Sequence, residues 1–340
     1  MKTWEYVTRR LLLLIPVLIG VTIITFVVSH VIPADPAMQF AGGPKAQPET
    51  IERIREELHL HEPLWVQYFY YLNDLIHFDL GKSYLENRPV TDSLAQYFPA
   101  TLELTIFAML ISIPLGIVGG IISAVRRNKL SDHITRFIAI VGYSLPIFWL
   151  ALMFQYVFAY QIPILPLEGR LSIGISAPPP VTGLFVLDSL LAGDPEACGS
   201  ALYHLLMPAF TLGFATLALI LRMTRSSMLE VLSADYIRTA RAKGLSERTV
   251  IFKHALRNAL IPTVTVTGLS FGALLGGAVL TETIFNWPGM GRFAASAVIG
   301  LDFNSVMGFT LVVAVTYVLA NLIVDLLYAV IDPRVKLGGV

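Results

Sequence analysis

Six long runs of apolar residues limit what this sequence can fold into. A run of about 20 apolar residues is long enough to cross a bilayer as an α-helix, and a spanning helix satisfies its own backbone polar groups. Of the 340 residues, 55% are hydrophobic and only 14% are charged, unlike a soluble domain. We therefore predict an all-α integral membrane protein with six transmembrane helices, at residues 11–32, 101–125, 134–160, 205–221, 261–280 and 306–330.

The first apolar run could be a signal peptide or a transmembrane helix. It follows Lys2, Arg9 and Arg10, and at residues 11–32 it exceeds the ~7–15-residue apolar core of a signal peptide. No small-residue cleavage site follows it cleanly. We predict that residues 1–32 hold an uncleaved first transmembrane helix.

The polar residues 33–99 form an insertion between the first two runs. Residues 47–60 have the periodicity of an amphipathic helix, and residues 65–80 are rich in aromatic side chains, as at a membrane interface. Two interpretations stay open: a packing surface of a small extramembrane subdomain, or a docking face for a soluble partner that delivers substrate. The candidate docking residues, two here and two in a later turn, are Trp65, Tyr68, Trp287 and Arg292.

Residues 100–340 are predicted to form a core with the other five transmembrane helices. Pro114 and Pro146 lie inside predicted spans, where we expect them to kink the helices. The proline-rich residues 161–203 are expected to be an irregular loop. Placing both termini in the cytoplasm puts 17 of the 24 Lys and Arg residues inside, with residues 33–99 outside the cytoplasm.

A basic segment at residues 222–258 lies between the fourth and fifth apolar runs. Residues 234–243 lack Pro and Gly and read as a short helix with Tyr236, Ile237 and Ala240 on an apolar edge. Gly244 suits a left-handed helix end, and Ser246 suits the N-cap of a second helix. An apolar edge on a helix pair at a membrane surface predicts a partner protein with a matching groove.

The amino-acid sequence of residues 235–245 within this segment resembles the cytoplasmic coupling loop, or EAA loop, of ABC-importer permeases. The similarity is greatest to the dipeptide/oligopeptide/nickel branch, in particular to the first permease chain of dipeptide-type importers. Arg238 and Thr239 replace the Glu-Ala of the general pattern, and Leu256-Arg257 stands where the family has Leu-Pro, departures that the peptide branch shares. The resemblance assigns ATPase coupling to Asp235, Tyr236, Ile237, Arg238, Thr239, Ala240, Arg241, Ala242, Lys243, Gly244 and Leu245.

Residues 100–104, 281–292 and 321–328 are similar to the same branch. The resemblance implies a type I importer permease in the cell (inner) membrane that forms half of the translocation pathway. It also implies a second homologous permease, two ABC ATPase subunits and an extracytoplasmic solute-binding protein. The chain has no P-loop, so ATP and Mg²⁺ are expected on the ATPase subunits, with no cofactor, metal or catalytic residue in this chain.

Dipeptides or oligopeptides are the expected cargo, with nickel and oligosaccharides as alternatives. An ion-coupled secondary transporter is a further alternative, with Glu103 and Asp325 as proton carriers. A pair between Asp325 and Arg222 or Arg225 is the structural alternative for that carboxylate. The formal net charge of zero argues against a nucleic-acid partner. The candidate structural or gating residues are Glu103, Pro114, Pro146, Asn321 and Asp325.

Overall fold

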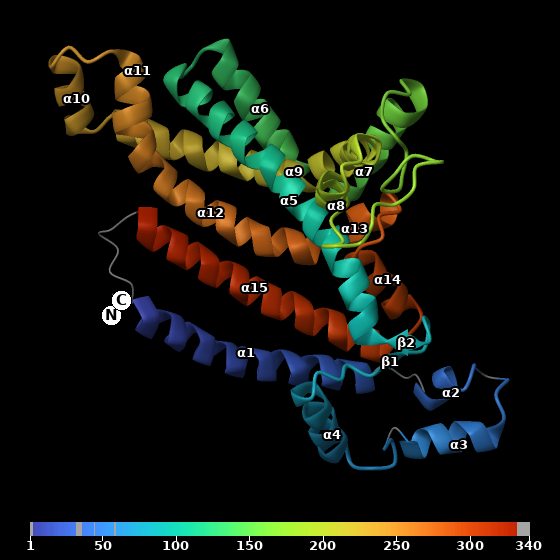
Figure 1. The fold of residues 1–340 in the computed structure, drawn as a ribbon. Helices are drawn as coiled ribbons and strands as arrows, with labels where there is room; N and C mark the ends of the chain where they lie inside the picture. The colour runs from blue at the N-terminus through green and yellow to red at the C-terminus, as the bar shows by residue number, and fades with distance from the viewer. Residues whose placement is uncertain (1–2, 32–35, 44, 58, 332–340) are drawn as a thin grey trace.

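The chain folds into a bundle of long helices, and shorter helices and two short strands lie at the two opposite ends of this bundle (Figure 1). The computed structural model describes residues 3–31, 36–43, 45–57 and 59–331, and the side chains of the last helix as far as residue 323. In chain order the elements are α1 (Thr3–Val31), α2 (Pro36–Phe40), α3 (Pro48–Glu57), α4 (Leu64–Ile76), β1 (Lys82–Ser83), β2 (Arg88–Pro89), α5 (Val90–Val125), α6 (Leu130–Ser144), α7 (Ile147–Phe154), the π-helix η1 (Gln155–Gln161), α8 (Phe185–Ala192), α9 (Pro195–Leu232), α10 (Asp235–Ala242), α11 (Glu247–Thr249), the π-helix η2 (Val250–Ala255), α12 (Leu256–Gly277), α13 (Val279–Ile284), α14 (Met290–Ile299) and α15 (Phe303–Ile331).

Among the described residues, five helices are long and apolar enough to cross a membrane. These are α1, α5, α9, the continuous α11–η2–α12 segment, and α15. A sixth span results if α6 and α7–η1 are counted together, although the two halves meet at an angle of 110°. The all-α membrane fold is therefore confirmed.

The break between α6 and α7 differs from the single kinked helix expected at residues 134–160. Pro146 has no amide hydrogen and disfavours helical geometry at the residue before it. Leu145 is accordingly extended, with φ −79° and ψ 131°, and its amide donates the last hydrogen bond of α6 to Val141. Pro146 marks the position of this bend in the sequence, whereas its size of 110° is known only from the structure.

Helix α5 starts at residue 90 rather than at 101 and runs through both Pro99 and Pro114. The expected boundary between residues 99 and 100 therefore lies inside a helix. Pro114 is accommodated without a break, since neighbouring groups can satisfy a carbonyl freed in a membrane helix.

The predicted irregular loop at residues 161–203 is also partly helical. It contains α8 and the first turns of α9. Asp194 caps α9 by accepting hydrogen bonds from the amides of Glu196 and Ala197, and Pro195 occupies the first helical position.

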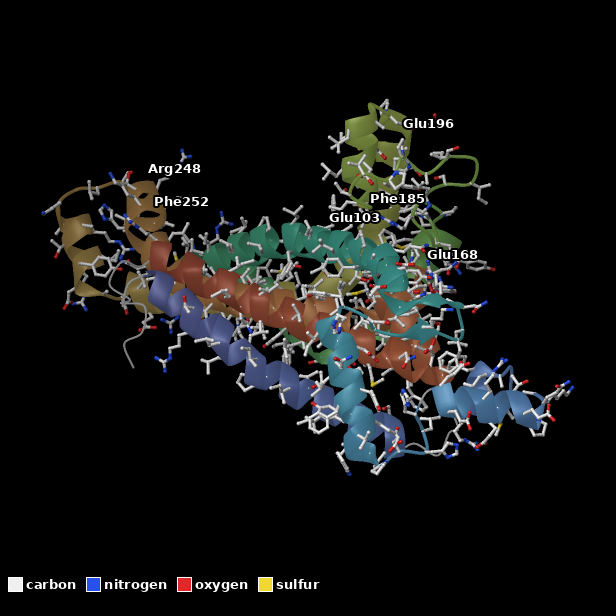
Figure 2. The ribbon with its side chains drawn as sticks, turned by 60° about the horizontal axis from the view of Figure 1, so that its bottom comes forward. Glu103, Glu168, Phe185, Glu196, Arg248 and Phe252 are labelled. Carbon is white, nitrogen blue, oxygen red and sulfur yellow. The ribbon has the colours of Figure 1, made fainter. Side chains whose placement is uncertain are left out.

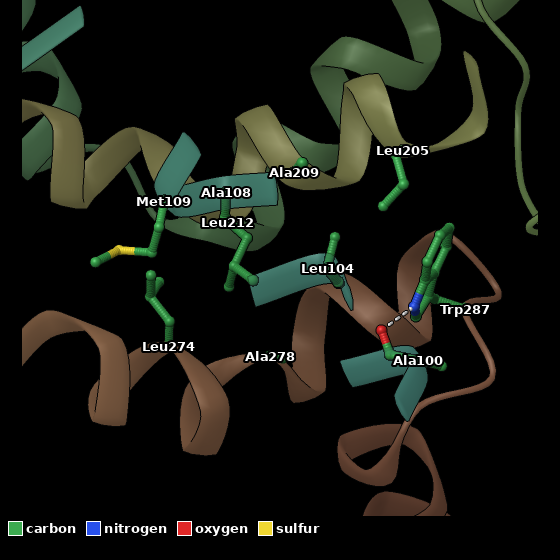
Figure 3. Packing of buried hydrophobic residues seen from close by; sticks show 10 residues of the cluster. All are labelled: Ala100, Leu104, Ala108, Met109, Leu205, Ala209, Leu212, Leu274, Ala278 and Trp287. Atoms are coloured by element: carbon green, nitrogen blue, oxygen red, sulfur yellow. Dashed lines mark hydrogen bonds between the residues drawn. The ribbon is translucent and has the colours of Figure 1, made fainter. Parts of the chain in front are cut away.

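The central helix pair is α5 and α9, which approach closely through small residues. A Cβ on Gly116 would lie 2.7 Å from Ile220, so only glycine fits there. Ser112 donates a hydrogen bond of 2.8 Å to the carbonyl of Gly213 across the pair. Figure 3 shows the core beside it, where Leu104, Leu205, Leu212, Leu274 and Trp287 meet.

The two ends of the bundle carry different elements (Figure 1). One end holds α10 and α11, together with the beginning of α1 and the end of α15. The other holds α2–α4, α13, α14 and the antiparallel strands, in which Lys82 pairs with Pro89 and Ser83 with Arg88. The helical character expected for residues 47–60 and 65–80 is confirmed by α3 and α4.

Candidate functional site

The helix–glycine–helix geometry predicted around Gly244 is confirmed. Gly244 has φ +77°, a left-handed conformation that glycine adopts without steric cost. Ser246 then caps α11, since its hydroxyl accepts a hydrogen bond from the amide of Thr249. The turn is further tied by Arg241, whose guanidinium Nε lies 2.8 Å from a carboxylate oxygen of Glu247.

Only two side chains of α10 are buried in the body of the protein. Ile237 is fully buried and Ala240 is 7% exposed, and both join a cluster that includes Met228 of α9 and Val250 of η2. Part of the apolar edge predicted for a partner is therefore used within the chain. The remaining described side chains from 235 to 245 are exposed: Asp235, Tyr236, Arg238, Thr239, Arg241, Ala242, Lys243 and Leu245.

The exposed surface of this end combines charge with scattered apolar groups. Tyr236 is 44% exposed, and its hydroxyl accepts a hydrogen bond of 2.8 Å from the side chain of Asn258. Leu245 is 40% exposed and Phe252 is 55% exposed. Figure 2 shows Phe252 and Arg248 at this end, far from Glu103. A rigidly anchored helix pair with such a surface is suited to contact another protein.

The anchoring cluster also connects α10 to three long helices. It contains Ile121 and Ala124 from α5, Met228 from α9 and Ala259 from α12. Packed side chains transmit displacement because protein interiors have few voids. A shift of α10 would therefore act on the ends of all three helices.

The opposite end contains a buried ion pair that the sequence did not reveal. The Oε2 atom of Glu103, on α5, lies 2.5 Å from Nη2 of Arg170. The side chain of Glu103 is 2% exposed and that of Arg170 is 8% exposed. Glu103 also accepts a hydrogen bond of 2.8 Å from the amide of Val186, and the guanidinium of Arg170 lies 3.5 Å from the ring centre of Phe185. Figure 2 shows Glu103 near Phe185. The charge in an apolar run was a visible signal, but its partner 67 residues away was not.

A second buried carboxylate, Glu282, joins α13 to α5 and α14. It accepts hydrogen bonds from the hydroxyl of Thr101, at 2.6 Å, and from the amide of Arg292, at 2.9 Å. The hydroxyl of Thr101 in turn accepts from the amide of Met290 at 2.8 Å. Burial raises the pKa of Glu282, while these hydrogen bonds and one from Gly291 oppose the rise. The arrangement locks the 281–292 turn onto α5.

The four candidate docking residues do not form one exposed surface. Trp287 is only 1% exposed, and its indole Nε1 donates a hydrogen bond of 2.9 Å to Ala100 (Figure 3). Its prediction as a docking residue is wrong, because a buried tryptophan here fills the core. Trp65 is 66% exposed and Arg292 is exposed. Tyr68 packs on α1, with its hydroxyl 3.0 Å from that of Thr22.

Among the candidate structural or gating residues, Pro114 lies within α5 and Pro146 lies at the α6–α7 break. Asn321 has a buried side-chain oxygen with no hydrogen-bond partner among the described residues. The side chain of Asp325 lies outside the described residues.

Arg225, a predicted partner of Asp325, instead pairs with Asp132. Its Nε lies 2.8 Å from Oδ1 and its Nη2 lies 3.1 Å from Oδ2, and Asp132 is fully buried. The hydroxyl of Ser123 also donates a hydrogen bond of 2.6 Å to Oδ1 of Asp132. The sequence did not single out Asp132, which lies in the first turn of α6 just after a polar connection between two apolar runs. Within the described residues, no group of three or more His, Cys, Asp or Glu side chains is placed to hold a metal ion.

Comparison with known proteins places the chain in a family. Residues 116–337 match the model described as "Binding-protein-dependent transport system inner membrane component", and residues 3–105 match the model of the N-terminal part of such membrane components. The chain is 50% identical over 334 residues to the dipeptide transport system permease protein DppB of Alkalihalophilus pseudofirmus, with 97% of this chain and 99% of the relative covered. It is 50% identical over 339 residues to the probable D,D-dipeptide transport system permease protein DdpB of Escherichia coli, covering 100% and 99%.

A more distant relative is the glutathione transport system permease protein GsiC of Escherichia coli, 40% identical over 332 residues, with 98% of this chain and 99% of the relative covered. These matches extend over almost the whole length of this chain. The chain belongs to the family of inner membrane components of binding-protein-dependent transport systems, the permease family that its 235–245 segment resembles.

Proposed function

We propose that this chain is one permease subunit of an ATP-driven importer for dipeptides or oligopeptides. The observation that carries the proposal is the 235–245 segment: a helix held by Ile237 and Ala240, with its polar face exposed beside a left-handed Gly244. The names of the relatives with 50% identity support a dipeptide cargo. A second permease would complete the translocation pathway.

In this proposal, two ATPase subunits contact the exposed face of α10 and its surroundings. ATP and Mg²⁺ bind to those subunits, whose closure moves α10. The cluster around Ile237 passes that movement to α5, α9 and α12, so that access to the pathway alternates between the two sides of the membrane. The present chain contributes gating and no covalent chemistry.

The same proposal sets the orientation in the inner membrane. The α10 end, with the beginning of α1 and the end of α15, faces the cytoplasm, as the positive-inside rule favours. The end with α2–α4, α13 and α14 then faces a solute-binding protein that delivers the peptide. An ion-coupled transporter is less well supported, because Glu103 is held by Arg170 and by the amide of Val186 rather than lying open to a proton path.

Replacing Gly244 with valine tests the coupling role. A β-branched residue at φ +77° costs about 1–3 kcal/mol of backbone strain, and no atom lies within 4 Å of the added Cβ. We expect the turn to distort and peptide uptake per ATP hydrolysed to fall at least about 5-fold. Uptake and ATP hydrolysis are measured together in proteoliposomes with all subunits.

The matched control is Gly193→Val. Gly193 is also left-handed, with φ +67° and open space around its Cβ, but it ends α8 at the opposite end of the bundle. The control is expected to retain the wild-type ratio of uptake to hydrolysis. A wild-type ratio in Gly244→Val, with normal membrane insertion, would refute the coupling role.

Replacing Trp65 with alanine tests whether the α2–α4 insertion docks the solute-binding protein. Its side chain is 66% exposed, and a tryptophan at the centre of an interface commonly contributes about 2 kcal/mol or more. We expect Trp65→Ala to weaken binding of the peptide-loaded binding protein about 30-fold, measured on the transporter in nanodiscs. Phe137→Ala, which removes a 67% exposed ring from α6, outside the insertion, serves as the control and is expected to keep the wild-type affinity. Unchanged affinity in Trp65→Ala would leave the insertion as a packing surface only.

A further inference from the structure

A cavity of 360 Å³ between α6 and α9 is lined by three arginines. Arg136 comes from α6, while Arg222 and Arg225 come from α9. Tyr143 and Ser226 also line it. The proposed coupling role does not use this cavity.

The three positive charges are not equally compensated. Arg225 is neutralised by Asp132, as described above. Arg222 lies with its guanidinium 5.5 Å from the ring centre of Tyr143, a cation–π contact that leaves its charge in place. Within the part of the chain that the structure describes, neither Arg222 nor Arg136 has a carboxylate within ion-pair distance. Among the described residues, these two guanidinium groups therefore have no counter-charge at this cavity.

The depth of the cavity fits a membrane interface. Helix α9 has 38 residues and is about 57 Å long, far longer than the ~30 Å hydrocarbon core. Arg222 lies about 15 Å from the α10-proximal end of that helix. On α6, Phe137 and Ile140 beside Arg136 are 67% and 63% exposed. Charge and exposed apolar surface thus occur together, as contact with a headgroup and its acyl chains requires.

We propose that this cavity binds the phosphate headgroup of an anionic phospholipid in the leaflet nearer α10. Arginine donates in a fork that matches phosphate oxygens, and basic pockets between membrane helices favour anionic headgroups. Free phosphate shares this chemistry, but the exposed Phe137 and Ile140 favour an acyl-chain-bearing ligand. The inference rests on the membrane fold and is independent of the cargo and of ATPase coupling.

Native mass spectrometry of the intact transporter tests the proposal. The complex is purified from mixed micelles that contain phosphatidylglycerol and phosphatidylcholine, and bound lipid is counted. Wild type is expected to retain phosphatidylglycerol, and the double variant Arg136→Gln/Arg222→Gln to retain about tenfold less. The control Arg126→Gln/Arg127→Gln removes the same charge from exposed residues outside the cavity and is expected to retain the wild-type amount.

A second variant keeps the charges and fills the cavity. Ser226 is exposed at the cavity wall, so Ser226→Trp is expected to reduce retained lipid while the complex still assembles. Four results would overturn the proposal: no retained phosphatidylglycerol in wild type, equal loss in the control pair, full retention in Ser226→Trp, or displacement by millimolar inorganic phosphate. If the second permease covered the cavity, wild type would retain no phosphatidylglycerol, and the proposal would be overturned.

Discussion

Replacing Arg170 with methionine is expected to destabilise the protein by about 3–5 kcal/mol. Methionine has a similar length but leaves Glu103, which is 2% exposed, as a buried carboxylate without its counter-charge. The other hydrogen bond that Glu103 accepts among the described residues, from the amide of Val186, cannot offset that loss. The loss is measured as a lower midpoint of thermal unfolding in detergent and as reduced yield of folded protein.

A double variant separates the ion pair from simple packing. If the uncompensated carboxylate is the cause, Arg170→Met combined with Glu103→Gln should recover much of the stability, because a neutral amide costs far less to bury. Arg292→Met is the matched control. Arg292 is exposed, so its loss should change stability by about 0.5 kcal/mol or less. An Arg170→Met variant as stable as wild type would show that this ion pair contributes little.

Replacing Gly289 with alanine is expected to destabilise the 281–292 turn by about 2–5 kcal/mol. The added Cβ would overlap the carboxylate of Glu282, which is fully buried. Either the carboxylate or the turn must move, and the hydrogen bonds to Thr101 and to the amide of Arg292 would then be lost. One methyl group would thus disturb the contact between α5 and α14.

Thermal unfolding and peptide uptake both measure this change. Gly277→Ala is the control, because no atom lies within 4 Å of the Cβ that it adds at the end of α12, and alanine favours helix there. We expect Gly277→Ala to be neutral or slightly stabilising. If Gly289→Ala matched it, the carboxylate of Glu282 would have room to move, and the turn would not depend on its present position.

Local chemistry explains which features could be predicted from the sequence. The turn at Gly244 followed from a glycine after a short helical pattern and from a serine two residues later, and each of these signals acts over a few residues. The long helices followed from apolar composition, because a spanning segment must satisfy its own backbone. The residues of the 235–245 segment could be named from their resemblance to the coupling loop of ABC-importer permeases, whereas their anchoring against α5, α9 and α12 could not be predicted.

The predictions that failed depended on geometry between distant segments. Trp287, in the 281–292 turn, was predicted as a docking residue, but that turn folds back and places the indole against Ala100. The apolar run at residues 134–160 was expected to be one helix kinked at Pro146; the bend is there, but at 110° it divides the run into two helices at the extended Leu145. Apolar periodicity records which residues avoid water and not the direction that the backbone takes.

The sequence by itself determined the membrane class, the positions of most long helices, the permease family and the helix pair around Gly244. Only the tertiary structure decided that Arg170 pairs with Glu103, that Arg225 pairs with Asp132 and that Arg136 and Arg222 share a cavity. The physical reason is the distance along the chain over which each interaction acts. Helix propensity, capping and apolar length act over one or a few turns, whereas the partner of a buried charge is set by how helices pack far along the chain.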